Sequence, residues 1–298
     1  MKFVVPITVD STNLTTDVAN TIADWSAGTY NLGDQAVVGE LAYEVVADPS
    51  TTDEPTVGAA KAVPTWIVAG YANEWRMWRE GTDSISSKVD DIETTVEVLT
   101  VVTTVAVLNV DALSVTVEMT DPVAGTVYDE TQAAADIGVP DWWEYFFTEY
   151  QRSAGLIFEG LPAYYGSGVD VIITITAASG GDTVSVGRAV IGRDVPSGQT
   201  LQGVKSRNLT FSQKVRDEFG GLTLTNRRTI RVVDFPVMLA SGDVDSIQRT
   251  AATLSATPTL FIGDSTKPET VVFGVLESFD TIINGLSVAE CSISVEEF

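Results

Sequence analysis

The residues best suited to chemistry in this chain are carboxylates beside a dense aromatic cluster. Asp141, Glu144 and Glu149 lie in residues 141–150, where six of the ten residues are aromatic. Two carboxyl groups roughly 5–10 Å apart across a sugar-binding cleft are the arrangement that glycosidases use. The alternative is that these acids belong to a chain of net charge −24 that carries carboxylates throughout. We expect the alternative, and therefore no catalytic residue and no enzyme.

Composition argues against the other common kinds of catalytic and cofactor site. The chain has no histidine, which removes Ser-His-Asp and Cys-His catalysis and histidine-ligated metals. The single cysteine, Cys291, lies in an alternating run, so we expect a small core residue rather than a nucleophile. The acidic pairs Asp90-Asp91 and Asp243/Asp245 lack the spacing of an EF-hand loop. We expect no metal and no cofactor.

Basic residues are concentrated in one window of this acidic chain. Nine of the 17 lysines and arginines lie between Arg188 and Arg231, with three acids, so the window carries +6. A nucleic-acid surface would need more interleaved aromatics than Phe211 and Phe219. The window has two possible interpretations. It is either a solvated face without a partner or an interface with an equally acidic protein. The residues expected at this assembly interface are Lys205, Arg207, Lys214, Arg216, Arg227, Arg228 and Arg231.

The predicted fold class is mainly β. Threonine and valine are abundant, and their branched side chains favour strands. We expect a small N-terminal β module at 1–72, a central jelly-roll-like or galactose-binding-like β-sandwich at 73–193, and a C-terminal β-sandwich with one packed helix at 194–298. The start of the chain lacks the apolar stretch of a signal peptide, and the longest apolar run is too short to span a bilayer, so we expect no membrane insertion.

Periodicity places the elements that would position these residues. Apolar residues alternate as in strands at 94–99, 103–108, 114–119, 169–177 and 183–191, and strand-like runs recur at 259–263, 271–276 and 286–295. Strands at 201–213 and 222–233 flank a Gly-Gly turn, which predicts a hairpin. Because Arg227, Arg228 and Arg231 alternate along this hairpin, we expect two basic surfaces, one on each side of it.

One helix is predicted after this hairpin. Val244, Ile247, Ala251 and Leu254 recur with helical spacing after a capping residue at Ser241 or Asp243, and Pro258 follows the last of them. These four residues form one apolar face, so we expect the helix to pack against the C-terminal strands.

The first segment resembles the small chitin-binding-like modules of carbohydrate-active enzymes and phage tail proteins. Trp25, Tyr30, Gly33-Asp34, Tyr43 and Trp66 occupy the places of that pattern, although the usual strand with an Asn-Gly turn is altered. The resemblance implies that Trp25, Tyr43 and Trp66 contact a glycan. The alternative is that these rings are the core of the module.

The central segment resembles a recurrent domain of tailed-phage virion proteins. The matching residues are Asn73, Trp75, Met77 and Trp78, then Asp141–Phe147, Leu161-Pro162, Val184–Gly187 and Gly192-Arg193. The aromatic residues of this cluster follow no amphipathic periodicity that would bury all of them on one face. We therefore expect Trp142, Trp143, Tyr145 and Tyr150 to form a ligand or partner surface. The strands and helix of the C-terminal segment resemble the β-sandwich of tail-tube and distal-tail proteins.

These resemblances imply a non-enzymatic structural component of a tailed-phage virion, at the tail tip or fibre attachment. The protein would be located in the phage tail and would assemble through its C-terminal domain with other tail proteins and copies of itself. One alternative is an adsorption protein that binds a host-surface glycan, and a second is a capsid decoration protein. We expect no nucleic-acid partner.

Overall fold

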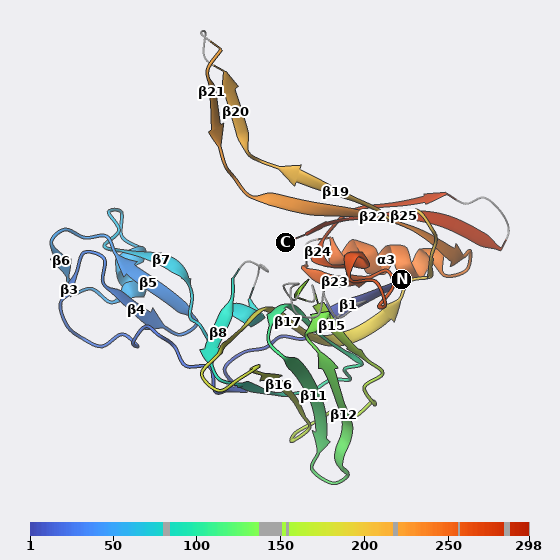
Figure 1. Cartoon of the computed structure of the whole chain (residues 1–298), viewed down its shortest axis with the longest axis horizontal. Coiled ribbons are helices and arrows are strands. Elements are labelled where there is room, and N and C mark those ends of the chain that lie inside the picture. The colour runs from blue at the N-terminus through green and yellow to red at the C-terminus, as the bar shows by residue number, and fades with distance from the viewer. Residues whose placement is uncertain are drawn as a thin grey trace, which may run out of the picture.

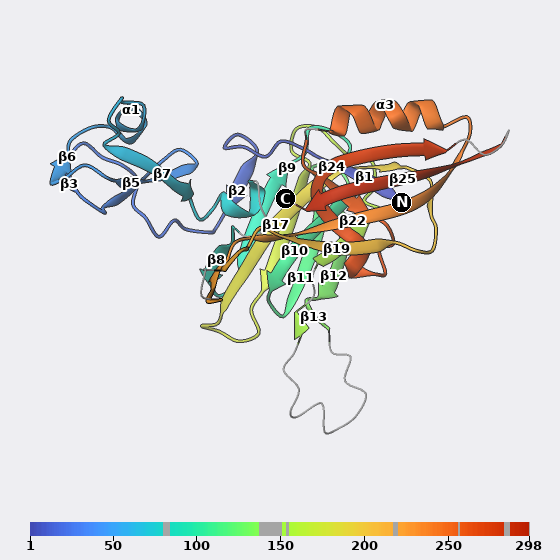
Figure 2. The same ribbon diagram turned by 90° about the horizontal axis from the view of Figure 1, so that it is seen from above.

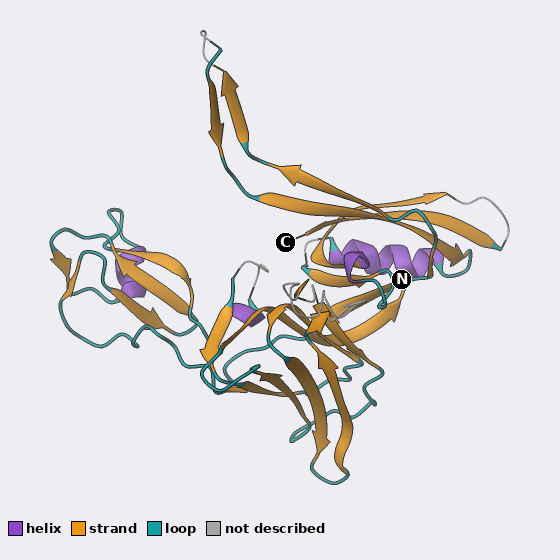
Figure 3. Cartoon of the chain, viewed as in Figure 1, coloured by secondary structure: helices purple, strands orange, loops and turns teal. Residues whose placement is uncertain are grey.

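The chain is mainly β, with one long helix packed on a curved sheet (Figure 3). The computed structural model describes residues 1–79, 84–136, 151–152, 155–216, 220–255, 257–282 and 287–297. The predicted fold class, a mainly β sandwich type with a packed helix, is confirmed.

An eleven-stranded sheet runs through the molecule. Its main path is β15-β10-β17-β1-β23-β24-β25-β22-β18, while β8 pairs with β17 and β19 pairs with β22. The strands are β1 (Lys2–Pro6), β8 (Ser86–Val89), β10 (Thr104–Asp111), β15 (Gly155–Glu159), β17 (Thr183–Pro196), β18 (Gln199–Thr200), β19 (Lys205–Thr210), β22 (Thr229–Ala240), β23 (Thr259–Ile262), β24 (Val271–Ile282) and β25 (Val288–Glu297).

A five-stranded sheet covers the β10-β15-β17 part of the large sheet. Its order is β12-β11-β16-β9-β2, and its strands are β2 (Leu14–Thr16), β9 (Ile92–Glu97), β11 (Ser114–Asp121), β12 (Gly125–Ala133) and β16 (Asp170–Thr176). Alternate residues such as Val117, Ile173 and Val96 point inward and pack against Val107 and Phe158. This period-two burial makes a sandwich whose outer face is polar.

The predicted helix is α3 (Val244–Leu254), and its buried residues are the four that the spacing indicated, Val244, Ile247, Ala251 and Leu254. They pack against Phe235 and other residues of β22, β24 and β25. Figure 2 shows α3 lying over this part of the large sheet. Asp243 occupies the N-cap position, but its side chain makes no capping hydrogen bond. Helix formation therefore depends mainly on burial of the apolar face.

Strand β1 links the two halves of the large sheet. It pairs antiparallel with β17 on one side and with β23 on the other. Phe3 packs in the core beneath α3, with its ring centroid 5.4 Å from that of Phe261, while Val4 enters a separate cluster on the opposite face. The first strand of the chain is therefore buried on both faces.

Residues between Trp25 and Tyr71 form a small module at one end of the molecule (Figure 1). Its elements are β3 (Tyr30–Asn31), β4 (Gln35–Val38), β5 (Leu41–Val45), β6 (Ser50–Thr51), α1 (Pro55–Ala59) and β7 (Trp66–Tyr71). Trp66 is fully buried at the centre of this module, and its indole Nε1 donates to the carbonyl oxygen of Asp53 at 3.0 Å.

The segment that follows this module, residues 73–78, has a structural role. It contains the short helix η1 (Arg76–Trp78), whose Met77 and Trp78 are buried in the sandwich core. The Asn73 amide donates to the carbonyl oxygens of Ala19 (3.0 Å) and Ser87 (2.7 Å) and accepts from the Ser87 amide (3.0 Å). This side chain fastens the linker to the sandwich.

The large sheet crosses both boundaries of the predicted central segment. β17 continues without interruption across residues 193 and 194, and β1, from the first predicted segment, lies beside it. The two short pairs that complete the fold are β13 (Ala135–Asp136) with β14 (Gln151–Arg152), and β20 (Gln213–Arg216) with β21 (Leu222–Thr225), and a second short helix is η2 (Pro268–Thr270).

Burial of β1 predicts a large stability cost at one position. Phe3→Ala should lower the free energy of unfolding by about 3–5 kcal/mol, because it removes a fully buried ring that packs on Phe261. Urea denaturation followed by circular dichroism measures this change. Val63→Ala, at a side chain that is 81% exposed, is the control and should change stability by less than about 0.5 kcal/mol. A Phe3→Ala loss as small as that of the control would show that β1 is not integral to the sheet.

Candidate functional site

The most distinctive surface feature is a projecting hairpin, residues 205–229, which we call the arm. It consists of β19, β20, β21 and the start of β22 and extends away from the body (Figure 1). The described residues of β19, β20 and β21 are all exposed. The hairpin that the sequence predicted is confirmed, with Lys214 opposite Leu224 and Arg216 opposite Leu222.

Hydrogen bonds maintain the ladder where the arm bends between its two strand pairs. The Arg227 amide donates to Ser212 Oγ at 3.0 Å, and the Phe211 amide donates to the carbonyl oxygen of Arg228 at 3.1 Å. The arm is therefore a continuous two-stranded structure rather than an irregular loop.

The two faces of the arm tip differ in chemistry. Cross-strand partners and residues two apart share a face, so Lys214, Arg216, Leu222 and Leu224 point to one side. We call this set the basic-apolar face. Leu222 is 52% and Leu224 is 63% exposed, and neither cation has an ion pair with a described residue. A ribbon that leaves leucines and cations in water on one face has the composition of a contact surface.

Three further predicted interface cations, Lys205, Arg207 and Arg231, lie at the base of the arm near acids of the same chain. Arg227 and Arg228 lie at the bend of the arm. The Arg207 guanidinium lies 3.7 Å from Glu277 Oε2, and Lys205 lies in a hollow lined also by Asp234, Glu277 and Asp280. Arg231 pairs with Asn208 and so points to the opposite side of the hairpin from Arg207. The base thus carries cations on both sides.

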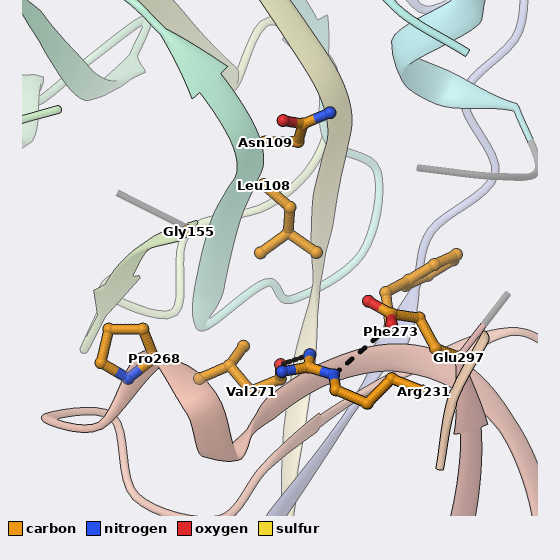
Figure 4. Close-up of a pocket in the computed structure, with 8 residues that line it drawn as sticks. All are labelled: Leu108, Asn109, Gly155, Arg231, Pro268, Val271, Phe273 and Glu297. Atoms are coloured by element: carbon orange, nitrogen blue, oxygen red, sulfur yellow. Dashed lines mark hydrogen bonds and ion pairs between the residues drawn. The ribbon is translucent and has the colours of Figure 1, made fainter. Parts of the chain in front are cut away.

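Arg231 lines a hollow of about 270 Å³ between β10 and β24 (Figure 4). Its Nε lies 3.4 Å from Glu297 Oε2, and its Nη2 donates to the carbonyl oxygen of Val271 at 3.0 Å. The carboxylate of Glu297 therefore balances the charge of the guanidinium within the chain. The hollow therefore offers an anionic ligand little free positive charge.

The outer face of the five-stranded sheet is acidic. Asp170 lies directly opposite Glu97 on the neighbouring strand, and Asp129 lies directly opposite Glu118. Glu93 lies two residues before Thr95 and four before Glu97, on the same side of β9. These five carboxylates define the acidic sheet face, and the strand residues described on this face include no lysine or arginine.

Like charges directly opposite each other destabilise a sheet. Burial, followed by the charge of Glu97, raises the pKa of Asp170 above its usual value. Two carboxylate pairs thus lie on one sheet face whose described strand residues include no lysine or arginine. A cationic partner at this face would relieve the repulsion.

The aromatic residues expected to bind a ligand fall into two groups. Tyr43 and Trp66 are buried in the core of the N-terminal module, and Trp25 packs partly buried against them, which favours the core interpretation over glycan stacking. Trp142, Trp143, Tyr145 and Tyr150, together with Asp141, Glu144 and Glu149, lie outside the described residues.

The acidic pairs weighed as calcium ligands have local structural contacts. Asp90 Oδ1 accepts from the Gly181 amide at 2.6 Å, and Asp91 Oδ1 accepts from the Ala177 amide at 2.7 Å. Asp245 forms an ion pair with Arg249 on α3. Within the part of the chain that the structure describes, no cluster of acids and thiols is suited to a metal ion. Cys291 is buried beneath α3, as expected of a small core residue.

The chain has no match among protein-family models, curated proteins or solved structures. No helix in the described ranges combines the length and apolar character needed to cross a membrane. The candidate site is therefore argued from the arm and the acidic sheet face themselves.

The sequence predicted the cations of the arm, but two features of the candidate site were not predicted. The first is the pair of leucines, which follow the Gly-Gly turn in a Leu-Thr-Leu alternation that matches Lys-Val-Arg on the other strand, and this signal was present in the sequence. The acidic sheet face carried a weaker signal. Its carboxylates come from four strands, and the register that pairs them depends on distant parts of the chain.

The carboxylate pairs generate a stability prediction with a defined sign. Because the pKa of Asp170 is raised in the folded state, its charged form is penalised at neutral pH and the penalty disappears on protonation. Asp170→Asn should stabilise the fold at neutral pH by roughly 0.2–1 kcal/mol, and the gain should vanish below about pH 3.9.

Urea denaturation across this pH range measures the difference. Asp24→Asn, at an exposed carboxylate outside the acidic sheet face, is the matched control and should show no such gain. An Asp170→Asn variant less stable than the parent at neutral pH would contradict the repulsion argument.

Proposed function

We propose that the chain is a non-enzymatic structural component of a tailed-phage virion, at the tail tip or fibre attachment, and that it assembles with copies of itself through its C-terminal part. The observation that carries the assembly proposal is the arm. It holds six basic and two acidic residues, so it carries +4 and leaves −28 for the rest of the chain.

Energetics support a role for the arm outside the monomer. An isolated two-stranded hairpin is marginally stable in water, and this one exposes Phe211, Val215, Leu222 and Leu224 without covering any part of the body's core. Contact with a partner would bury those side chains and order the ribbon. Two copies of net charge −24 repel each other at long range, but the contact of an arm of +4 with a body of −28 is locally attractive at distances shorter than the screening length.

The virion assignment rests on the sequence resemblances. Four of the residues that carry the resemblance of the central segment have structural roles, because Trp75, Met77, Trp78 and Leu161 are buried. A curved sheet covered by one helix is compatible with the resemblance to tail-tube and distal-tail proteins, which remains a fold-level analogy.

Self-association of the intact chain tests the assembly proposal. Sedimentation velocity should show oligomers at about 0.1 M salt, where the repulsion between the two bodies is screened beyond about 10 Å while close charge pairs in the contact persist. Their fraction should fall towards about 1 M salt, where the screening length is about 3 Å. A chain that stays monomeric at about 0.1 M salt over a wide concentration range would contradict assembly through the arm.

Immunogold electron microscopy of phage particles tests the location. Label at the tail is expected. Label on the capsid would instead support a decoration protein. Glycan-array binding that is lost in Trp142→Ala with Trp143→Ala, in a chain that stays monomeric, would support the adsorption alternative.

A further inference from the structure

The receiving surface for the arm can be inferred from chemistry on the opposite side of the molecule. The arm extends from one side, whereas β11, β12 and β16 of the five-stranded sheet lie on the other (Figure 1). A chain cannot bring its own arm tip to its own acidic sheet face in this arrangement. A second copy has no such restriction.

The two surfaces match in charge. The basic-apolar face presents Lys214 and Arg216, whose positions are about 7 Å apart because they are alternate residues of a strand. The acidic sheet face presents the pairs Asp170/Glu97 and Asp129/Glu118. Each pair of carboxylates that repel one another within one chain would gain one cation from the neighbour, which turns an unfavourable contact into a favourable one.

The two surfaces also match in their apolar parts. Ile172 points outward on the acidic sheet face, since it lies opposite Glu118 on one neighbouring strand and Thr95 on the other. It is half-buried and is flanked by the carboxylates. Leu222 and Leu224 are flanked in the same way by the cations of the arm tip. An apolar centre with a charged rim is the usual anatomy of a protein interface.

We infer that the basic-apolar face of the arm docks on the acidic sheet face of a second copy of this chain, with Leu222 and Leu224 over Ile172 and with Lys214 and Arg216 beside the carboxylate pairs. This inference rests on the proposed self-assembly and adds the surface that receives the arm.

Charge reversal on each surface tests the contact. The arm variant is Lys214→Glu with Arg216→Glu, and the face variant is Glu118→Lys with Asp129→Lys. The face variant keeps a like-charged pair at the same place and reverses its sign. Each should weaken self-association of the full chain about tenfold or more, measured by sedimentation velocity at about 0.1 M salt.

Restoration provides the decisive measurement. A chain that carries both sets of substitutions has an acidic arm and a basic receiving pair, so it should self-associate within about threefold of the parent. A mixture of the arm variant with the face variant should also associate more strongly than either variant alone. Asp243→Lys with Glu269→Lys, at two exposed carboxylates outside both surfaces, is the matched control and should retain association.

The outcomes separate the two proposals. A parent chain that does not self-associate overturns both. A parent that associates while the face variant associates equally well, or while the combined chain is not restored, overturns this inference alone and leaves self-assembly standing.

Cooperative thermal unfolding by circular dichroism checks that each variant folds. If Glu118→Lys disturbs the fold through the hydrogen bond that Glu118 accepts from Thr126, Asp129→Lys with Asp170→Lys takes its place. Asp129 and Asp170 each belong to one of the two carboxylate pairs, so the expected weakening is the same.

Discussion

The antiparallel pairing of β1 with β17 and β23 is the interaction on which the large sheet depends. Without this strand, the part of the sheet that packs in the sandwich and the part that carries α3 would share no continuous ladder along the main path. Phe3 and Val4 enter different cores, so the same five residues stabilise both faces of the sheet. The arm projects from β22 of this sheet, and its direction is therefore fixed by the sheet as a whole.

The elements that could be predicted from the sequence are those whose signal is local. The helix at Val244–Leu254 follows from four apolar residues at helical spacing, and the arm hairpin follows from alternation around a Gly-Gly turn. The role of Lys2–Pro6 could not be predicted in this way, because its partners lie about 190 and 260 residues further along the chain. A strand of five residues with an apolar centre contains no information about which strands it will join.

The same distinction applies to the candidate site. The positive charge of the arm could be predicted from composition. Predicting that Lys214, Arg216, Leu222 and Leu224 share one face would have required knowledge of the hairpin register. The opposed carboxylates required the register of two further strand pairs. For Tyr43 and Trp66 the sequence left two interpretations open, contact with a glycan and the core of the module, and both side chains are buried in the core of a small domain.

The arm and the acidic sheet face lie on opposite sides of one chain, and this placement gives any assembly built from their contact a direction. One end of such an assembly would display unoccupied cationic arms, and the other end would display unoccupied acidic sheet faces. Proteins that bind at the two ends would meet surfaces of opposite charge, and each could select its own end by charge alone. A single asymmetric subunit would thereby encode the order in which different components attach.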